Sequence, residues 1–317
     1  MSNVLAVDIG GTHFRLGLFD AQGRRLLLSE GGTETSGGRD WMLTEIRERA
    51  QDLIAKSDQT VQACGISFGG PVDFRRQQVS SMHVSGWRNF ALAAWAEENL
   101  SLKSRVDNDA NAGALGEFRF GAGRGAESIL YLTLSTGIGG GLVCRGGVHR
   151  GRDSMAGELG HIPVSDAGAL CSCGGRGCLE TICSGTAIGL RGRGLARRKP
   201  EVVPRTLELS SGDPEKITAE MVFRAAGEGE RGALFIVREA ARALARGILI
   251  AVRLLNPDMI VLGGGVALSG SILLEPVHEY LDEFSAPMLE HSTKVVQAEL
   301  GKLSPLYGAA ALGLELA

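Results

Sequence analysis

Apolar and polar positions alternate along the chain in a pattern that predicts two successive series of strands and helices. In the first series, the apolar run at 4–7, the alternating run at 14–19 and the run at 24–29 predict strands joined by short polar turns. Apolar residues between Trp41 and Ile54 then recur at helical spacing. Further strands are expected at 61–68 and 104–106, and helices at 90–100 and 110–118. This first series predicts an antiparallel meander that opens an α/β domain.

The second series repeats, in mid-chain, the strand, glycine turn and strand of the N-terminus. A strand is expected at 128–135, a glycine turn at 136–141 and a strand at 142–144. Helices are expected at 185–198, 217–228, 233–255 and 306–316, and a strand at 259–262. Residues 151–184 are rich in Gly and Cys and are expected to be irregular. The recurrence predicts two similar halves.

Composition narrows the class of protein. A chain of 317 residues suits two domains of ordinary size. Lys plus Arg is 33 and Asp plus Glu is 36, and this weakly acidic balance argues against binding to nucleic acid, which needs a basic face. No apolar run reaches membrane-spanning length, and Met1 leads into the first apolar stretch without the basic region of a secretory signal. We therefore expect no membrane contact and a cytoplasmic location.

Three glycine-rich turns, each after an apolar strand, are candidates for holding phosphate. Turns without side chains let backbone N–H groups approach phosphate oxygens, and a neighbouring Thr adds a hydroxyl donor. Asp8 in the first turn could also hold Mg²⁺ through water. The alternative is that each turn only separates two elements. The residues expected to contact the nucleotide are Asp8, Gly10, Gly11, Thr12, Thr136, Gly137, Gly139, Gly264 and Gly265.

The run Asp107-Asn108-Asp109-Ala110-Asn111 lies at a predicted junction of strand and helix. A carboxylate there can accept the proton of a hydroxyl and orient its oxygen toward a γ-phosphate, so Asp109 is the candidate base. Asn108 could bind a neighbouring hydroxyl. The alternative is a helix N-cap cluster, which explains one of these acidic residues but not all of them.

His161, Cys171, Cys173 and Cys178 form a Cys₃His set that suits tetrahedral Zn²⁺. A disulfide between Cys171 and Cys173, with one residue between them, would be strained. Since four protein ligands leave no position for water, the predicted zinc site is structural. The alternative is a group of free or redox-active cysteines.

Two further motifs have weaker support. Gly65-Ile66-Ser67-Phe68-Gly69 matches the nucleophile elbow of a serine hydrolase, but Gly70-Pro71 follows where an elbow needs the start of a helix. The Gly-x-Gly-x-x-Gly pattern at 227–232 lies between two predicted helices with no preceding strand, so we interpret it as a surface turn. The P-loop pattern does not occur in the sequence.

Taken together, these motifs resemble one family, the ROK group of sugar kinases and regulators. The stretches 5–12 and 135–141 resemble its two phosphate motifs. Gly157-Glu158-Leu159-Gly160-His161, followed by the cysteine-rich stretch 171–180, is similar to its hallmark segment. The resemblance covers the chain from residue 4 to about residue 312.

The resemblance implies an α/β fold of two ribonuclease-H-like lobes of the actin/hexokinase ATPase type, with a structural zinc loop. The small lobe would span 1–112 and be joined by the C-terminal helix 303–317, and the larger lobe would span 113–302. The two lobes would close over a hexose, and a homodimer is expected by analogy. The hexose-binding residues would be those at Gly70, Asn108, Asp109, Glu158, His161 and Glu180.

The resemblance further implies transfer of the ATP γ-phosphate to a hexose 6-hydroxyl, with Mg²⁺ and with Asp109 as the base. Glucose is the expected hexose; N-acetylmannosamine and N-acetylglucosamine are alternatives, and polyphosphate is an alternative donor. A sugar-sensing regulator is the alternative from another class, but the first strand starts at Val4 and leaves no room before it for a DNA-binding domain. Gly69, where the family has Pro, and His83-Val84, where it often has Asn-Leu, depart from the pattern beside the expected sugar pocket.

Overall fold

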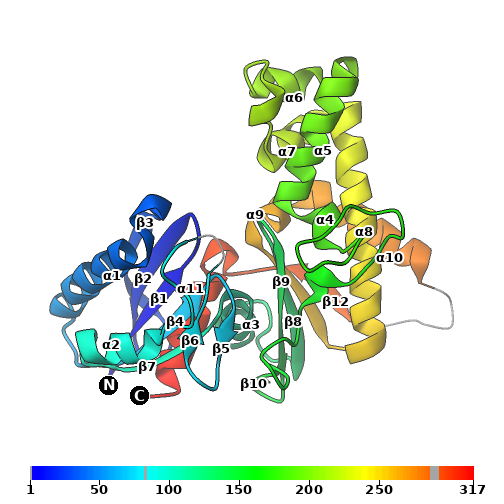
Figure 1. Ribbon diagram of the computed structural model, residues 1–317. Helices are drawn as coiled ribbons and strands as arrows, with labels where there is room; N and C mark the ends of the chain where they lie inside the picture. Colours follow the sequence, from blue (N-terminus) through cyan, green and yellow to red (C-terminus); the bar gives the residue numbers. More distant parts are fainter. Residues whose placement is uncertain (1, 82–83, 286–292) are drawn as a thin grey trace. The chain divides into compact units, whose positions relative to one another are not determined.

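The computed structural model describes residues 2–81, 84–285 and 293–317, and the chain packs as two compact units (Figure 1). Unit 1 comprises Met1–Tyr131, Gly141–Ala156 and Ala298–Ala317, and unit 2 comprises Leu132–Gly140 and Gly157–Gln297. The lobes implied by the family resemblance change at 112/113, so unit 1 contains chain that the prediction gives to the larger lobe. Among the described residues, no helix is long and apolar enough to cross a membrane.

Unit 1 is built on a five-stranded sheet in the order β3-β2-β1-β4-β7. Its strands are β1 (Asn3–Ile9), β2 (His13–Phe19), β3 (Arg25–Gly32), β4 (Val61–Phe68) and β7 (Lys103–Asn108). The first three strands form the predicted antiparallel meander, and β4 and β7 extend the sheet in the parallel sense from β1. The carboxyl ends of β1, β4 and β7 therefore lie at one edge.

Alternate residues of β1 serve the two faces of this sheet. Leu5 and Val7 belong to a core shared with α1 (Gly38–Ala55) and α2 (Leu92–Leu100). Val4 and Ala6 belong to a second core shared with α11 (Ser304–Leu314). This period of two explains why β1 is apolar throughout: both of its faces are covered.

Helix α11 approaches β4 and α3 (Asp109–Phe120) so closely that glycine is required. A Cβ at Gly65 would lie 1.8 Å from the carbonyl oxygen of Ala309, and one at Gly308 would lie 1.7 Å from that of Ala112. Backbone atoms cannot move aside as a flexible side chain can, so larger residues at these positions would displace the helix. The C-terminal helix is thus packed into unit 1.

A second five-stranded sheet has the order β10-β9-β8-β11-β12. Its strands are β8 (Ser128–Leu134), β9 (Ile138–Cys144), β10 (Gly147–Val148), β11 (Met259–Gly263) and β12 (Lys294–Gln297). The boundary between the units crosses β8 and β9. In both sheets the strands follow the chain in the order third, second, first, fourth, fifth, which confirms the predicted similarity of the two halves.

The helices of unit 2 are α4 (Glu180–Cys183), α5 (Gly185–Arg198), α6 (Pro204–Leu209), α7 (Ala219–Gly227), α8 (Arg231–Leu255), α9 (Gly264–Ala267) and α10 (Ser271–Phe284). The shorter elements are β5 (Val72–Asp73), β6 (Gln78–Val79) and the 3-10 turns η1 (Thr35–Gly37), η2 (Leu159–His161), η3 (Pro200–Val202), η4 (Pro214–Lys216) and η6 (Gly301–Leu303). The helices predicted at 185–198 and 233–255 are confirmed, whereas the sequence pattern missed α6 and α10.

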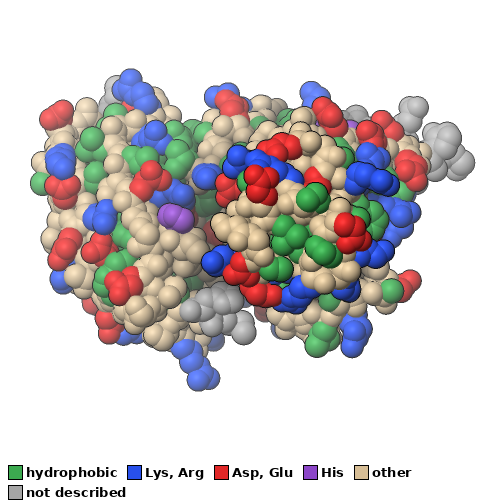
Figure 2. Space-filling view, turned by 90° about the horizontal axis from the view of Figure 1, so that it is seen from above, with side chains coloured by type: hydrophobic (Ala, Val, Ile, Leu, Met, Phe, Trp, Pro, Cys, Tyr) green, Lys and Arg blue, Asp and Glu red, His purple; other side chains and the backbone are tan. Residues whose placement is uncertain are grey.

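The glycine turn predicted at 136–141 is wrong in its second half, because β9 begins at Ile138. Glycine is needed there for close packing: a Cβ at Gly140 would lie 2.1 Å from the carbonyl oxygen of Gly157, and one at Gly141 would lie 2.4 Å from that of Ala110. Gly139 accordingly lies on a strand and not in a turn. Charged side chains of both signs are interspersed over the face shown in Figure 2, as the nearly balanced totals of 33 basic and 36 acidic residues lead one to expect.

Candidate functional site

The carboxyl ends of the parallel strands bring the predicted site residues of unit 1 together. Asp8 on β1 pairs with Ser67 on β4, which pairs with Asp107 on β7. The N–H of Gly69 donates to the carbonyl of Ile9 at 2.8 Å. A Cβ at Gly69 would lie 3.5 Å from the Cα of Gly10 and 3.8 Å from Oδ2 of Asp109. The first glycine turn and the Asp109 carboxylate are therefore neighbours.

Asn108 caps α3 and also reaches the Gly70 loop. Its Oδ1 accepts from the N–H groups of Ala110 and Asn111, at 2.9 and 3.4 Å. Its Nδ2 donates to the carbonyl of Gly70 at 3.0 Å. The N-cap role considered for this run belongs to Asn108, and Asp109 is the first residue of the helix.

Asp8 is buried and paired within unit 1. Burial raises the pKa of this carboxyl, while the Ser67 hydroxyl and the Arg15 guanidinium act to lower it. Ser67 donates to Oδ1 of Asp8 at 2.8 Å and is fully buried. A serine with its hydroxyl committed to a carboxylate and closed to solvent is no nucleophile, so the hydrolase hypothesis loses its residue.

The first glycine turn is tight and faces outward. The N–H of Gly10 donates to the carbonyl of His13 at 2.9 Å, and a Cβ at Gly10 would lie 2.7 Å from that oxygen. Gly11 and Thr12 are exposed, and nothing lies within 4 Å of a Cβ placed at Gly11. The turn can therefore present main chain and a hydroxyl to a ligand.

In unit 2, the other two glycine turns meet at the end of β8. A Cβ at Gly264, whose φ is +82°, would lie 2.4 Å from the carbonyl oxygen of Leu134. The N–H of Gly185 donates to the carbonyl of Ser135 at 2.7 Å, and the Thr186 hydroxyl donates to that of Thr136 at 2.8 Å. Two of the three predicted phosphate turns are thus adjacent within this unit.

Glu180 lies against the turn at Gly137. Its Oε2 accepts from the N–H of Ile138 at 2.8 Å and would lie 2.5 Å from a Cβ at Gly137. Sequence reasoning assigned these two residues to different ligands, Glu180 to the hexose and Gly137 to the nucleotide. The structure places them side by side.

The predicted metal ligands gather in unit 2 in an arrangement that fits zinc. Donor atoms of His161, Cys171 and Cys173 all lie within 4.8 Å of one another. Nδ1 of His161 is 3.5 Å from Sγ of Cys171, and Sγ of Cys173 is 3.7 Å from Sγ of Cys178. Tetrahedral zinc with ordinary bond lengths separates two sulfurs by about 3.8 Å, and a sulfur from a nitrogen by about 3.6 Å. Cys178 contacts Cys173 but is not part of the group of three.

The two acidic residues expected at the hexose act electrostatically on His161. Nε2 of His161 is 3.8 Å from Oε2 of Glu158. Burial raises the pKa of Glu158, the neighbouring Glu180 raises it further, and His161 acts to lower it. Burial acts to lower the pKa of His161, but the Cys171 hydrogen bond and the charges of Glu180, Cys171 and Glu158 outweigh it and raise the pKa. The three predicted hexose-binding residues of unit 2 therefore form one group.

The model of the ROK family matches residues 4–315. The chain belongs to the ROK family. A glucokinase of Thermotoga maritima is 35% identical over 311 residues, covering 98% of this chain and 96% of the relative. The structure of a ROK family glucokinase from Streptomyces griseus in complex with glucose and AMPPNP matches with a TM-score of 0.87 and 33% identity, over 99% of this chain and 100% of that one. The family and the α/β fold predicted from the motifs are confirmed.

This ROK protein also resembles regulators. A xylose repressor of Caldicellulosiruptor bescii is 24% identical over 315 residues, covering 98% of this chain and 78% of the repressor. Sequence similarity to the family therefore extends to kinases and to repressors, and the site residues have to decide between them.

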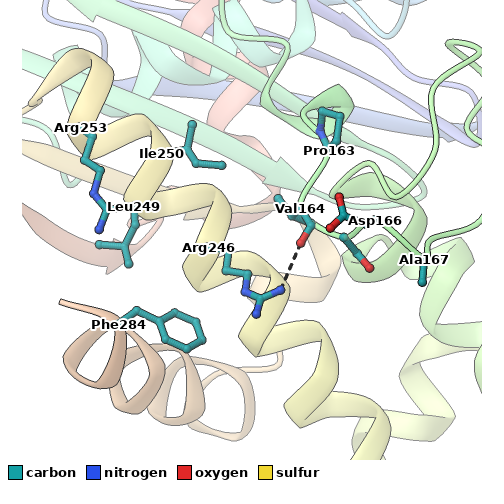
Figure 3. Close-up of a pocket in the computed structure, with 10 residues that line it drawn as sticks. Pro163, Val164, Asp166, Ala167, Arg246, Leu249, Ile250, Arg253 and Phe284 are labelled. Carbon is teal, nitrogen blue, oxygen red and sulfur yellow. Dashed lines mark hydrogen bonds between the residues drawn. The ribbon is translucent and has the colours of Figure 1, made fainter. Parts of the chain in front are cut away.

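A separate cavity in unit 2 of this ROK protein contains none of the predicted site residues. It has a volume of about 740 Å³ and lies between the stretch 163–167 and helix α8 (Figure 3). Nη1 of Arg246 crosses its wall and donates to the carbonyl of Val164 at 3.2 Å. The stretch that lines the cavity follows His161 in the chain.

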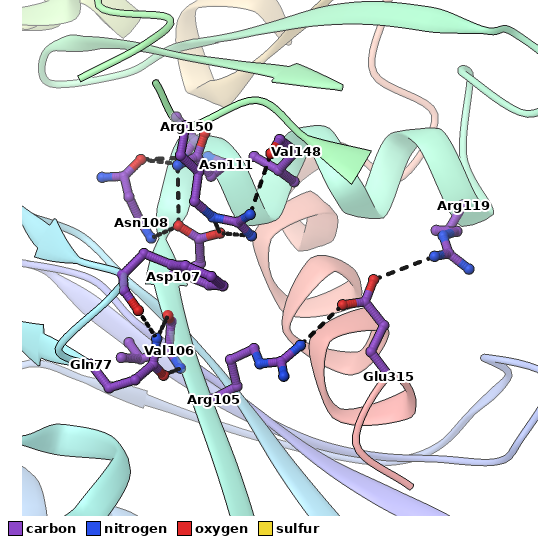
Figure 4. A network of polar contacts seen from close by, with 12 residues as sticks. Gln77, Arg105, Val106, Asp107, Asn108, Asn111, Arg119, Val148, Arg150 and Glu315 are labelled. Atoms are coloured by element: carbon purple, nitrogen blue, oxygen red, sulfur yellow. Dashed lines mark hydrogen bonds and ion pairs between the residues drawn. The ribbon is translucent and has the colours of Figure 1, made fainter. Parts of the chain in front are cut away.

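Sequence reasoning missed the surroundings of Asp107 in this ROK protein. Asp107 was part of the quoted run but had no role, and Arg150 and Phe74 were not considered. The structure joins these three residues behind the start of α3 (Figure 4). The only available signal was that three acid or amide side chains followed one another at the end of a strand.

Proposed function

We propose that this ROK protein transfers the γ-phosphoryl group of ATP to the 6-hydroxyl of glucose. The observation that carries the proposal is the contact among the Gly10 turn, the Gly69-Gly70 loop and the Asp109 carboxylate at one strand edge. A base next to an exposed glycine turn suits phosphoryl transfer to a hydroxyl. The glucokinase relatives, 35% identical in Thermotoga maritima and 33% in Streptomyces griseus, support the substrate.

In this proposal Asp109 accepts the proton of the 6-hydroxyl as its oxygen attacks the γ-phosphorus. Asn108 and the Gly70 loop hold the hexose in unit 1, and Glu158, His161 and Glu180 hold it in unit 2. The backbone of the three glycine turns binds the phosphates, with Thr12 and Thr136 adding hydroxyl donors. Mg²⁺, when bound through water near Asp8, supplies neutralising charge. Most of the rate then comes from positioning and charge neutralisation.

We also propose that His161, Cys171, Cys173 and Cys178 hold a structural zinc ion. The separations of the donor atoms, 3.5 and 3.7 Å, fit a tetrahedral set. Zinc orders the segment that carries Glu158 and Glu180. Since Nδ1 of His161 points to Cys171, its Nε2 is left to face Glu158 and the sugar.

The experiment is ATP consumption against a panel of hexoses and N-acetylhexosamines with Mg²⁺ present, and with the zinc content determined in the same sample. Turnover on glucose and about one zinc per chain support both proposals. Turnover on an N-acetylated hexose only would make the protein a kinase of another sugar, and would point to Gly69 as a specificity residue. The other departure, His83, lies outside the described residues.

Repeating the panel with polyphosphate in place of ATP tests the donor. A folded, zinc-bound protein that binds glucose without turning it over would favour a sugar-sensing role. The expected homodimer is tested by light scattering coupled to gel filtration on the same sample.

A further inference from the structure

Asp107, two residues before the proposed base, has a carboxylate that accepts four hydrogen bonds (Figure 4). Its Oδ2 accepts from Nε and Nη2 of Arg150, at 2.8 and 2.6 Å. Its Oδ1 accepts from the N–H of Asn108 at 2.8 Å and from Nδ2 of Asn111 at 3.1 Å. Only 2% of the Asp107 side chain is exposed. Burying a charge is costly unless it is paired and hydrogen-bonded, and here each oxygen has two donors.

Arg150 is held in place from two other sides. Its guanidinium carbon lies 3.5 Å from the centroid of the Phe74 ring, within the range of a cation–π contact. Its Nη1 donates to the carbonyl of Val148 at 3.3 Å. The turn that carries Phe74 is itself joined to β7, since Oε1 of Gln77 accepts from the N–H of Val106 at 2.7 Å. The guanidinium therefore has one defined position.

These contacts frame Asp109. The residue before it is held through its backbone N–H, and the residue two places after it is held through its side chain, both by the same carboxylate of Asp107. Asn108 in turn links the frame to the Gly70 carbonyl. The main chain from which the Asp109 side chain departs is thus determined by Asp107, and Asp107 by Arg150.

We propose that Asp107 and Arg150 are positioning residues for phosphoryl transfer: they hold the turn 108–111 so that the Asp109 carboxylate meets the acceptor hydroxyl. This inference rests on the proposed function. The pair lies within unit 1 and contacts neither phosphate nor sugar in this scheme. A misplacement of about 1 Å in such a reaction can cost about a hundredfold in rate, so a pair of this kind has a large effect on turnover.

The test compares Arg150→Lys and Asp107→Asn with the wild type in steady-state glucose phosphorylation. Lys keeps the charge but supplies neither the two converging N–H donors nor the planar face against Phe74. Asn keeps the shape of Asp107 and an oxygen for the Asn108 N–H but loses the charge. We expect each variant to lower kcat roughly thirtyfold to a hundredfold, with the KM for ATP changed by less than about threefold. Phe74→Leu, which removes only the ring, should lower kcat less.

Glu315→Gln is the matched control. Glu315 accepts from Arg105 and Arg119, each at 3.3 Å, in an exposed ion-pair cluster of the same unit (Figure 4). Because exposed pairs contribute little, kcat should stay within about twofold of the wild type. Active sites are counted in every sample from the stoichiometry of glucose binding by calorimetry, so that kcat refers to folded enzyme.

A double-mutant cycle separates positioning from stability. If Arg150 acts through Asp109, Arg150→Lys should cost little further activity in an Asp109→Asn background. Equal losses in both backgrounds, or a kcat per active site equal to the wild type with only a lower melting temperature, would overturn the inference. Absence of glucose phosphorylation in the wild type would overturn the proposed function and this inference with it.

Discussion

In unit 1 the proposed hexose-binding residues stand where a strand becomes a helix, whereas in unit 2 two of the three lie on a stretch with little regular structure. Asn108 ends β7 and Asp109 begins α3. Glu158 and His161 belong to the described chain between β10 and α4, which forms one 3-10 turn and isolated bridges. Gly157, Gly174 and Gly177 in that stretch have positive φ.

The difference lies in what holds each group. The edge in unit 1 is held by parallel strand pairing, a helix cap and the Asp107 carboxylate, all of which form as the sheet forms. The stretch in unit 2 has a His and three Cys close enough to share one ion. One group is therefore built by the fold itself, and in our proposal the other is completed by a metal.

The largest expected effect concerns the base in unit 1. Asp109→Asn should lower kcat about a thousandfold, within the range of about 10² to 10⁴ that general bases contribute, because the amide cannot accept the proton of the hydroxyl. Glucose affinity, measured by calorimetry, should change by less than about threefold. Loss of glucose binding together with turnover would make Asp109 a binding residue.

The next effect should distinguish the two units directly. Cys173→Ala should lose zinc and destabilise the protein by at least about 3 kcal/mol, or about 6–12 °C in Tm, because structural zinc contributes folding free energy. Hydrogen exchange should rise in 157–180 and stay unchanged in 103–120. Cys64→Ala, at a fully buried cysteine of β4 outside the metal group, is the control for cysteine removal without zinc loss. A folded, active and zinc-free Cys173→Ala would contradict the structural-zinc proposal.

A smaller effect is expected where unit 1 buries a charge without an ion. Ser67→Ala should cost about 1–3 kcal/mol in the free energy of unfolding, because it removes a donor from the buried Asp8 carboxylate. The raised pKa of Asp8 makes its ionised form the costly one, so this loss should be greater at pH 8 and shrink as falling pH protonates the carboxyl. Urea unfolding at several pH values measures both.

Ser36→Ala is the matched control for that comparison. The Ser36 hydroxyl donates to Oε1 of Glu34 at 3.0 Å, also to a carboxylate but at an exposed position. Its loss should stay within about 0.5 kcal/mol. A Ser67→Ala protein as stable as Ser36→Ala would show that Asp8 finds another donor.

Much of the fold could be predicted because its elements have strong periods. The strand at 61–68 and the helix at 185–198 match β4 and α5 residue for residue, since their apolar positions alternate or recur cleanly. The candidate site was predicted in part for a different reason. Asp109, the glycine turns and the cysteines carry side chains, or an absence of side chains, that are uncommon outside chemistry of this kind.

The errors also have physical reasons. Gly139, Gly140 and Gly141 indicate a turn by composition, yet they continue β9, because neighbouring carbonyls come within 2.4 Å of where a Cβ would be at the last two. Serine 67 satisfies a hydrolase motif, yet it is buried against Asp8. Neither outcome can be read from residues nearby in the sequence, since each depends on a segment far away in the chain.

The sequence by itself determined the family, the order of most elements and the residue types of the site, because those follow from local periods and short motifs. Only the tertiary structure decided what each polar group contacts. The Asp107 carboxylate meets Arg150, 43 residues away, and Glu180 meets the turn at Gly137, 43 residues before it. Long-range contacts of this kind are selected by the packing of whole sheets and helices, where every buried charge must find its donors.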